Sequence, residues 1–366
     1  PVEGDYYLPR EDLSRLMSQF LENRIHAVLI GPRRFGKTSF VLNLLKDFEE
    51  KGYSTLFVDI FNITSHLDFL NQLLRALHSK KTWLERFKKY LMKLRPKLTT
   101  DFDSVTGQAS LGMSFQASSE KDVKEVIQEV LDEFGMLGDK VIIAIDEFQK
   151  VSEIDDKGWL EATLRTHMQQ MRNTTFLFTG SRKSIIYDML NNSSRPFYRS
   201  CQPIEFPSFG PEFTDWILER FSEAGVRCQR KAVEHLRDLV QDTPNYVQMV
   251  CFHLVALGKN DIGIQEIDDT LSTVVRQNAY AYQTLLSTFS LSQQRALRLA
   301  ASHGKQVFAK GLLIKYQISS AAVLSAALQI LKAKGILDEE GTGRGVVLFD
   351  DPLFAIWLRF IFIPNP

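Results

Sequence analysis

The sequence predicts an α/β fold with a five-stranded parallel sheet, followed by a helical domain and a winged helix. Five short apolar runs alternate with helical segments over the first 208 residues, which is the pattern of parallel strands joined by right-handed helical crossovers. The third run, Val141–Ile145, is continuously apolar, as a strand covered by helices on both faces should be. From Leu291 the pattern changes to three short helices and a glycine-rich turn, which indicates a separate C-terminal domain.

The predicted strands share a short, mainly apolar sequence bounded by turn residues or by helical segments. They are residues 26–30, 54–60, 141–145, 174–180 and 201–206. In a parallel sheet of this kind, ligands bind at the carboxyl ends of the strands. The candidate functional residues are therefore those that directly follow a strand.

The composition is that of a folded protein without a strong charge bias. The chain has 366 residues, 44% of them hydrophobic, which is enough for about two or three domains. Its 44 basic and 44 acidic residues cancel, so binding to nucleic acid or to an anionic membrane would need a local patch. Three cysteines lack metal-ligand spacing and are expected to be reduced thiols. With neither a signal peptide nor a membrane span in view, we predict a soluble, cytoplasmic protein.

The turn after the first strand matches the phosphate-binding pattern G-x-x-x-x-G-K-[ST], with the sequence LIGPRRFGKTSF at 29–40. Glycines let the backbone wrap a phosphate, and the following helix directs its free N–H groups at the anion. Lys37 adds a positive charge at the β and γ phosphates, and Thr38 offers a hydroxyl to Mg²⁺. The alternative, a basic surface turn, does not account for the strand-to-helix context. The predicted nucleotide-binding residues are Gly31, Pro32, Arg33, Arg34, Phe35, Gly36, Lys37, Thr38 and Ser39.

Two acidic residues follow the third strand, in KVIIAIDEFQKV at 140–151. Asp146 is expected to hold Mg²⁺ opposite Thr38, and Glu147 to orient and deprotonate the attacking water. At the end of the fourth strand, in FTGSR, a polar or basic group such as Arg182 can sense the γ-phosphate. A helix-capping Ser181 beside a solvated Arg182 is the alternative.

These motifs together resemble the STAND class of AAA+ P-loop ATPases, and most of all the prokaryotic archaeal-type ATPases. The segments that carry the resemblance are GPRRFGKTS at 31–39, IDEFQK at 145–150, FTGSR at 178–182, RPFYR at 195–199 and DTPNYVQ at 242–248. The resemblance implies an ATPase core, a helical domain and a winged helix, with ATP or ADP and Mg²⁺ as cofactors. It also implies a nucleotide-driven switch, closed with ADP and open with ATP.

The resemblance assigns further residues. Lys37, Glu147 and Arg182 take the catalytic roles, Arg182 as the sensor arginine, and Thr38 with Asp146 takes the metal. Pro244 matches a proline that packs on adenine, although Asp242 stands where a glycine is usual, and Arg10 matches an arginine that covers the adenine face. At the C-terminal end, Asp350 stands near the place where relatives have a histidine that contacts ADP.

Two arginines before the fifth strand, Arg195 and Arg199, are candidates for a finger that reaches a neighbouring subunit. A nucleotide-dependent homo-oligomer would follow. An equally good interpretation is a structural pair that grips the adjacent loop.

Residues 80–119 do not belong to a minimal core. Odd-numbered apolar residues from Val105 to Phe115 predict a β-hairpin. The basic part before it, with Trp83, Phe87 and Tyr90, is either a solvated amphipathic helix or a contact for nucleic acid or protein.

The expected domains are 1–208, 209–287 and 288–366. The third helix of the last domain offers few cations, since Lys332 and Lys334 come only at its end, and Arg344 in the wing stands among acids. We therefore expect this domain to pack on the ATPase core rather than to read DNA. Three functions remain open: an ATP-hydrolysing switch with a protein partner, a DNA-binding regulator or mobile-element ATPase, and a non-hydrolysing nucleotide-binding scaffold.

Overall fold

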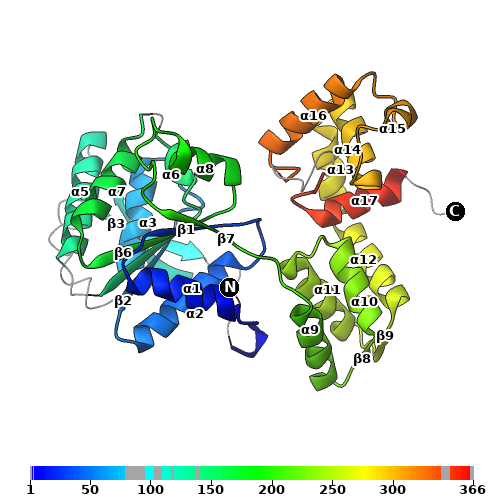
Figure 1. The fold of residues 1–366 in the computed structure, drawn as a ribbon, viewed down its shortest axis with the longest axis horizontal. Coiled ribbons are helices and arrows are strands. Elements are labelled where there is room, and N and C mark those ends of the chain that lie inside the picture. The colour runs from blue at the N-terminus through cyan, green and yellow to red at the C-terminus, as the bar shows by residue number, and fades with distance from the viewer. Residues whose placement is uncertain are drawn as a thin grey trace. The chain divides into compact units, whose positions relative to one another are not determined.

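The chain is described by a computed structural model that covers residues 2, 4–78, 95–102, 109–116, 119–136, 140–155, 157–338 and 347–362 (Figure 1). It divides into two compact units. The first consists of Pro1–Gly31 with Lys37–Phe206, and the second of Pro32–Gly36 with Pro207–Pro366. No helix within these ranges is both long and apolar enough to cross a membrane.

A five-stranded parallel sheet forms the centre of the first unit, in the order β2-β5-β6-β1-β7. All five predicted strands are confirmed, with bounds that differ by at most one residue at either end. They are β1 (Ala27–Ile30), β2 (Ser54–Asp59), β5 (Val141–Asp146), β6 (Thr174–Gly180) and β7 (Gln202–Glu205). In the register of β2 and β5, Asp59 lies opposite Asp146, so the carboxyl ends of these two strands meet at one edge.

Successive residues of a strand point to opposite faces of the sheet, and every residue of β1, β5 and β6 is buried. Both faces of the sheet are therefore covered by helices. On one face Ile143, Ile145, Phe176 and Phe178 pack in a single buried cluster with apolar residues of four helices. These are α3 (His66–His78), α5 (Glu120–Gly135), α7 (Trp159–Gln170) and α8 (Lys183–Asn191). The short α6 (Lys150–Glu153) follows β5.

On the other face lie α1 (Glu11–Glu22), which contacts β1 and β6, and α2 (Lys37–Glu50), which contacts β2 and β5 (Figure 1). Thr175, which alternates with Phe176, donates a hydrogen bond from its hydroxyl to the carbonyl of Leu21 at 3.4 Å. This contact ties β6 to α1. A short 3₁₀ turn, Gly4–Tyr6, precedes α1, and the backbone N–H of Val2 donates to the hydroxyl of Ser39 on α2.

The predicted β-hairpin is confirmed. Strands β3 (Arg95–Phe102) and β4 (Ala109–Gln116) pair antiparallel, with Arg95 opposite Gln116 and Phe102 opposite Ala109. The hairpin forms a sheet of its own, and β4 lies beside α3. Val105 and the basic part with Trp83, Phe87 and Tyr90 lie outside the described residues.

The second unit is mainly helical. A short parallel pair, β8 (Arg227–Cys228) and β9 (Asp261–Ile262), lies between helices. Arg359 donates from Nε to the carbonyl of Ala301 at 2.6 Å, which joins the last helix to α14. The helices are α9 (Glu212–Glu223), α10 (Arg230–Leu239), α11 (Pro244–Ala256), α12 (Ile264–Gln277), α13 (Ala279–Ser287), α14 (Leu291–His303), α15 (Lys310–Lys315), α16 (Ala321–Ala333) and α17 (Pro352–Phe362).

The C-terminal helices α14 to α16 precede an antiparallel bridge between Leu337 and Phe349. Three helices followed by such a pair are the order that a winged helix requires. Residues 339–346 of the predicted wing lie outside the described part of the chain, so the winged helix stays a prediction. The division between the two units lies between Phe206 and Pro207, close to the expected boundary after residue 208. The separation of residues 209–287 from 288–366 as two domains stays a prediction.

Candidate nucleotide-binding site

The predicted phosphate-binding loop joins β1 to α2. Its first glycine, Gly31, is buried, and a Cβ there would lie 2.7 Å from the Cβ of Phe206, so a larger residue would collide. Gly36 has a φ of +92°, which favours glycine. Lys37 begins α2, is 6% exposed, and donates from Nζ to the carbonyl of Gly31 at 2.8 Å. The ammonium group thus folds back across the loop at the start of a 14-residue helix, where free backbone N–H groups attract a phosphate.

The predicted metal ligands come together. The Thr38 hydroxyl donates to Oδ2 of Asp146 at 2.6 Å, although 108 residues separate the two in sequence. The Thr179 hydroxyl, from β6, and the backbone N–H of Glu147 both donate to Oδ1 of Asp146, the latter at 2.9 Å. Hard oxygen donors of this kind suit Mg²⁺, which binds through one or two carboxylates together with substrate phosphates and waters. The residues present therefore fit the cation.

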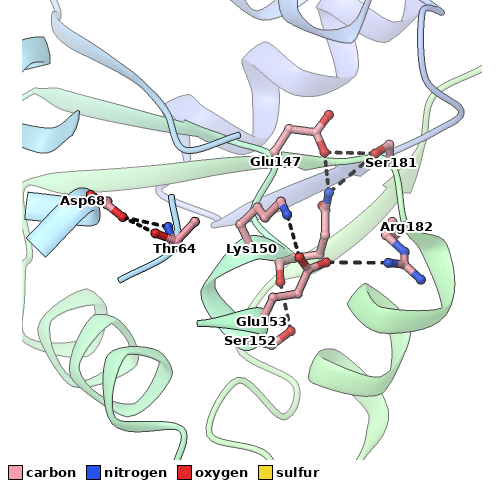
Figure 2. Close-up of polar contacts among 9 residues, drawn as sticks. Thr64, Asp68, Glu147, Lys150, Ser152, Glu153, Ser181 and Arg182 are labelled. Carbon is pink, nitrogen blue, oxygen red and sulfur yellow. Dashed lines mark hydrogen bonds and ion pairs between the residues drawn. The ribbon is translucent and has the colours of Figure 1, made fainter. Parts of the chain in front are cut away.

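Glu147 lies beside this pair, and two side chains hold it. Its Oε2 accepts a hydrogen bond from the Ser181 hydroxyl at 2.9 Å and another from Nε2 of Gln149. Figure 2 shows Glu147 and Ser181 facing each other from the ends of neighbouring strands. The backbone of Glu147 has a φ of +60°, a left-handed conformation that is uncommon outside glycine and costs on the order of 1–3 kcal/mol.

Arg182, the predicted sensor arginine, follows Ser181 and contacts α6. Its guanidinium lies 3.7 Å from Glu153, which also pairs with Lys150 at 2.7 Å (Figure 2). Arg182 and Glu153 have side chains 34% and 30% exposed, so the pair is partly solvated and contributes little stability. The Ser181 hydroxyl donates to Glu147, and Arg182, the residue directly before α8, makes no side-chain capping hydrogen bond.

Asp59 was missed by the sequence analysis. It ends β2 beside Asp146 and is exposed as a residue. Partial burial of its carboxyl raises the pKa above the ordinary value, and the charges of Asp146 and Glu147 add to the increase. The backbone N–H of Phe61 opposes the increase through a hydrogen bond to Asp59 at 2.8 Å. The signal available in the sequence was an acid at the end of the second strand, which is a neighbour of the third in sheets of this kind.

The predicted adenine-binding residues lie in different units. Arg10 directly precedes α1, and its guanidinium lies 4.3 Å from the centre of the Phe206 ring in the first unit. Pro244 is the first residue of α11 in the second unit. Asp242, two residues earlier, has a φ of +53° and binds Arg237 at 2.6 Å. A left-handed residue here accounts for the glycine expected at that position.

The two candidate finger arginines differ in their surroundings. Arg195 lies 3.1 Å from Oε1 of Glu161, whose side chain is 2% exposed, and 3.8 Å from Asp188. Arg199 is exposed, and its guanidinium lies 5.1 Å from the centre of the Tyr198 ring. Arg195 therefore has a structural partner inside the first unit, and Arg199 is the arginine with its side chain toward solvent.

Comparison with protein families gives a match that covers more than half of the chain. The model of an ATPase domain found predominantly in Archaea matches residues 11–209. The chain belongs to this family. The matched range contains the phosphate-binding loop, Asp146, Glu147 and Arg182, so the family and the site geometry agree on an ATPase with ATP or ADP as its nucleotide. Comparison with curated proteins finds no significant match.

Solved structures similar to this ATPase support its fold. The Walker-type ATPase PABY2304 of Pyrococcus abyssi has a TM-score of 0.66 at 18% identity, over 97% of each chain. The ORC2 protein of Aeropyrum pernix, in ADPNP and ADP complexes, has a TM-score of 0.55 at 14% identity over 98% of this chain and 96% of that one. The ORC1 protein of the same organism, in complex with DNA, has a TM-score of 0.53 at 14% identity, over 96% of this chain and 93% of that one. The ATPase therefore has the AAA+ P-loop fold.

Proposed function

We propose that this AAA+ ATPase binds ATP with Mg²⁺ at the loop from Gly31 to Ser39, hydrolyses it slowly, and acts as a STAND-class switch on a protein partner. The observation that carries the proposal is the contact of Thr38 with Asp146 beside a Glu147 that is held by two donors. A scaffold that only bound nucleotide would not need a glutamate in this arrangement.

We assign each of these residues a role in binding or hydrolysis. Lys37 and the N-terminus of α2 bind the phosphates. Thr38 and Asp146 would hold Mg²⁺, which supplies positive charge to the phosphate oxygens. Glu147 accepts a proton from the attacking water, and Arg182 contacts the γ-phosphate once it leaves Glu153.

Slow turnover is expected because, among the residues that the structure describes, Arg182 is the one arginine that we assign to the γ-phosphate bound by the same copy of the chain. Arg199, being exposed, is the better candidate for a finger that enters a second copy of the chain, because Arg195 is engaged by Glu161. Such a finger contributes about 10³ to 10⁵ in rate. Specific activity should therefore increase with protein concentration if the chain assembles with ATP bound.

A protein partner is favoured over DNA by the exposed face of α16. This face carries Val323 and Ile330, which are 40% and 45% exposed, and its first lysine is Lys332. A helix that enters the major groove needs cations for the phosphates and polar side chains for the bases. DNA binding stays the second candidate, because the ORC1 structure similar in fold is a complex with DNA.

The test is the nucleotide that co-purifies with the protein, together with the turnover of Glu147→Gln. We expect retained ADP in the wild type, and in the variant unchanged ATP affinity with hydrolysis reduced at least 100-fold, a loss of the size that removal of a general base produces. Equal turnover in both proteins would remove Glu147 from the role of base. An empty site after purification would argue against a switch that is held closed by ADP.

A further inference from the structure

Gln149 has a buried side chain, and its contribution to protein stability does not explain why a polar amide stands at this position. The residue is 1% exposed, and its Nε2 donates to Glu147 while lying 3.5 Å from the Ser181 hydroxyl. Its Oε1 is buried and accepts no hydrogen bond within the described part of the chain. A buried polar atom without a partner costs about 1–3 kcal/mol. An apolar side chain would fill the same space without that cost, so the amide has another use.

The neighbouring strand leaves room for this amide. A Cβ on Gly180, the last residue of β6, would overlap both the Gln149 oxygen and the Ile186 side chain. Because Gly180 has no Cβ, the Gln149 side chain can pass close to the end of β6 and reach Glu147. The backbone is fixed at the same place, since the N–H of Phe148 donates to the carbonyl of Thr179 at 2.8 Å.

Both donors hold the same oxygen of the glutamate. Ser181 and Gln149 bind Oε2, and Oε1 accepts no hydrogen bond from the residues that the structure describes. With the backbone of Glu147 in a left-handed conformation and one carboxylate oxygen anchored twice, few orientations of the side chain are available. Oε1 is thereby presented as the remaining acceptor.

We propose that Gln149 is a positioning residue for hydrolysis, which acts with Ser181 to anchor Oε2 of Glu147 so that Oε1 takes the proton of the attacking water. The proposal rests on the proposed role of Glu147 as base. In that step the water oxygen bonds to the γ phosphorus and the bond to the β–γ bridging oxygen breaks. The proton passes to Oε1, and ADP and phosphate leave.

The experiment compares Gln149→Met and Ser181→Ala with a matched control, Ser152→Ala. Methionine keeps the length of the side chain and removes the donor, and Ser152 is a half-buried serine of α6 whose hydroxyl binds the backbone carbonyl of Gln149 instead of Glu147. Because misplacing a reacting group by about 1 Å can cost 10²-fold, we expect kcat to fall roughly 10- to 100-fold in the two test variants. KM and calorimetric ATP affinity should stay unchanged, and the control should keep the wild-type kcat.

The same substitutions in a Glu147→Gln background separate positioning from a direct role. If Gln149 and Ser181 act through Glu147, they should cause no further loss in single-turnover rate once Glu147 has been replaced. An equal loss in both backgrounds, or an unchanged kcat in Gln149→Met and Ser181→Ala, overturns the proposal. If Glu147→Gln itself retains full turnover, the proposed base fails first, which is a distinct result. Ser181→Thr, which keeps the hydroxyl, should restore most of the kcat lost in Ser181→Ala.

Discussion

Replacing Arg195 with alanine should lower the stability of the first unit instead of removing activity from a neighbouring copy. The guanidinium lies 3.1 Å from Glu161, whose side chain is 2% exposed, so the substitution leaves a buried carboxylate without this cation. Breaking a fully buried pair costs about 3–5 kcal/mol. The Arg195 side chain is 28% exposed, so water replaces part of the lost interaction, and we expect a loss of about 2–3 kcal/mol.

The loss should depend on pH in a defined direction. Burial raises the pKa of Glu161 above its ordinary value of 4.5, and Arg195 opposes that increase. Without Arg195 the pKa in the folded state rises further. A carboxyl whose pKa is raised on folding costs stability above its unfolded pKa, and the cost disappears when the group is protonated in both states. The difference between Arg195→Ala and the wild type should therefore be largest at neutral pH and shrink as the pH falls toward 4.5.

Thermal unfolding followed by circular dichroism measures this loss. For a unit of about 200 residues, 1 kcal/mol corresponds to about 2–4 °C, so the expected decrease in Tm is about 4–12 °C at neutral pH. Arg199→Ala, an exposed arginine in the same segment, is the matched control and should leave Tm unchanged. Glu161→Gln in the Arg195→Ala background should recover part of the loss. If Arg195→Ala unfolds at the wild-type temperature but loses a concentration-dependent increase in turnover, the structural assignment is wrong and Arg195 is the finger.

Three other substitutions or conditions test the site and the partner. Lys37→Ala should abolish ATP binding by calorimetry while leaving the circular dichroism spectrum unchanged, and unchanged affinity would contradict the phosphate-binding role. Asp59→Asn should raise Tm at neutral pH, because a carboxyl whose pKa is raised on folding destabilises the folded state when it is ionised. The substitution should have no effect on Tm well below pH 3.8, the ordinary pKa of the group. A lower Tm at neutral pH would show that the fold needs the charge of Asp59. Any binding of the full chain to duplex DNA should vanish between roughly 50 and 200 mM salt, and a footprint that persists at the higher concentration would favour DNA over protein as the partner.

The sequence predicted those parts of the fold that local patterns determine. Each of the five strands is a short apolar run between turns or helices. The odd-numbered apolar residues from Val105 to Phe115 predicted a hairpin, of which Ala109–Gln116 is one strand, but they did not indicate its partner strand, Arg95–Phe102. The approach of Thr38 to Asp146 was also predictable, because both follow strands whose carboxyl ends lie at one edge of a parallel sheet. Motif spacing and sheet topology together determine that contact.

The pairing of Arg195 with Glu161 and the anchoring of Glu147 by Gln149 could not be predicted in the same way. Arg195 and Glu161 are 34 residues apart, and whether their side chains meet depends on how the segment after α8 packs against α7. In the segment IDEFQK, the sequence analysis assigned roles to the two acids and none to Gln149. The Gln149 side chain can point toward Glu147 only because Gly180, at the end of β6, has no Cβ to block it. Both contacts arise from packing between elements, which no local pattern encodes.

Residues that end or follow β6 contact the residues that end or follow β5. Thr179 donates to Asp146, Ser181 donates to Glu147, and Arg182 pairs with Glu153. The proposed metal ligand and the proposed base are thus both held by one short segment, which also contains the proposed sensor arginine, so a substitution in it is expected to displace more than one of them. Groups that act as a unit give strongly non-additive kinetic effects. The rate of a single Thr179 or Ser181 variant reports the loss of the whole arrangement. Each such substitution should therefore be compared with the same substitution in a background where its partner, Asp146 or Glu147, has also been replaced.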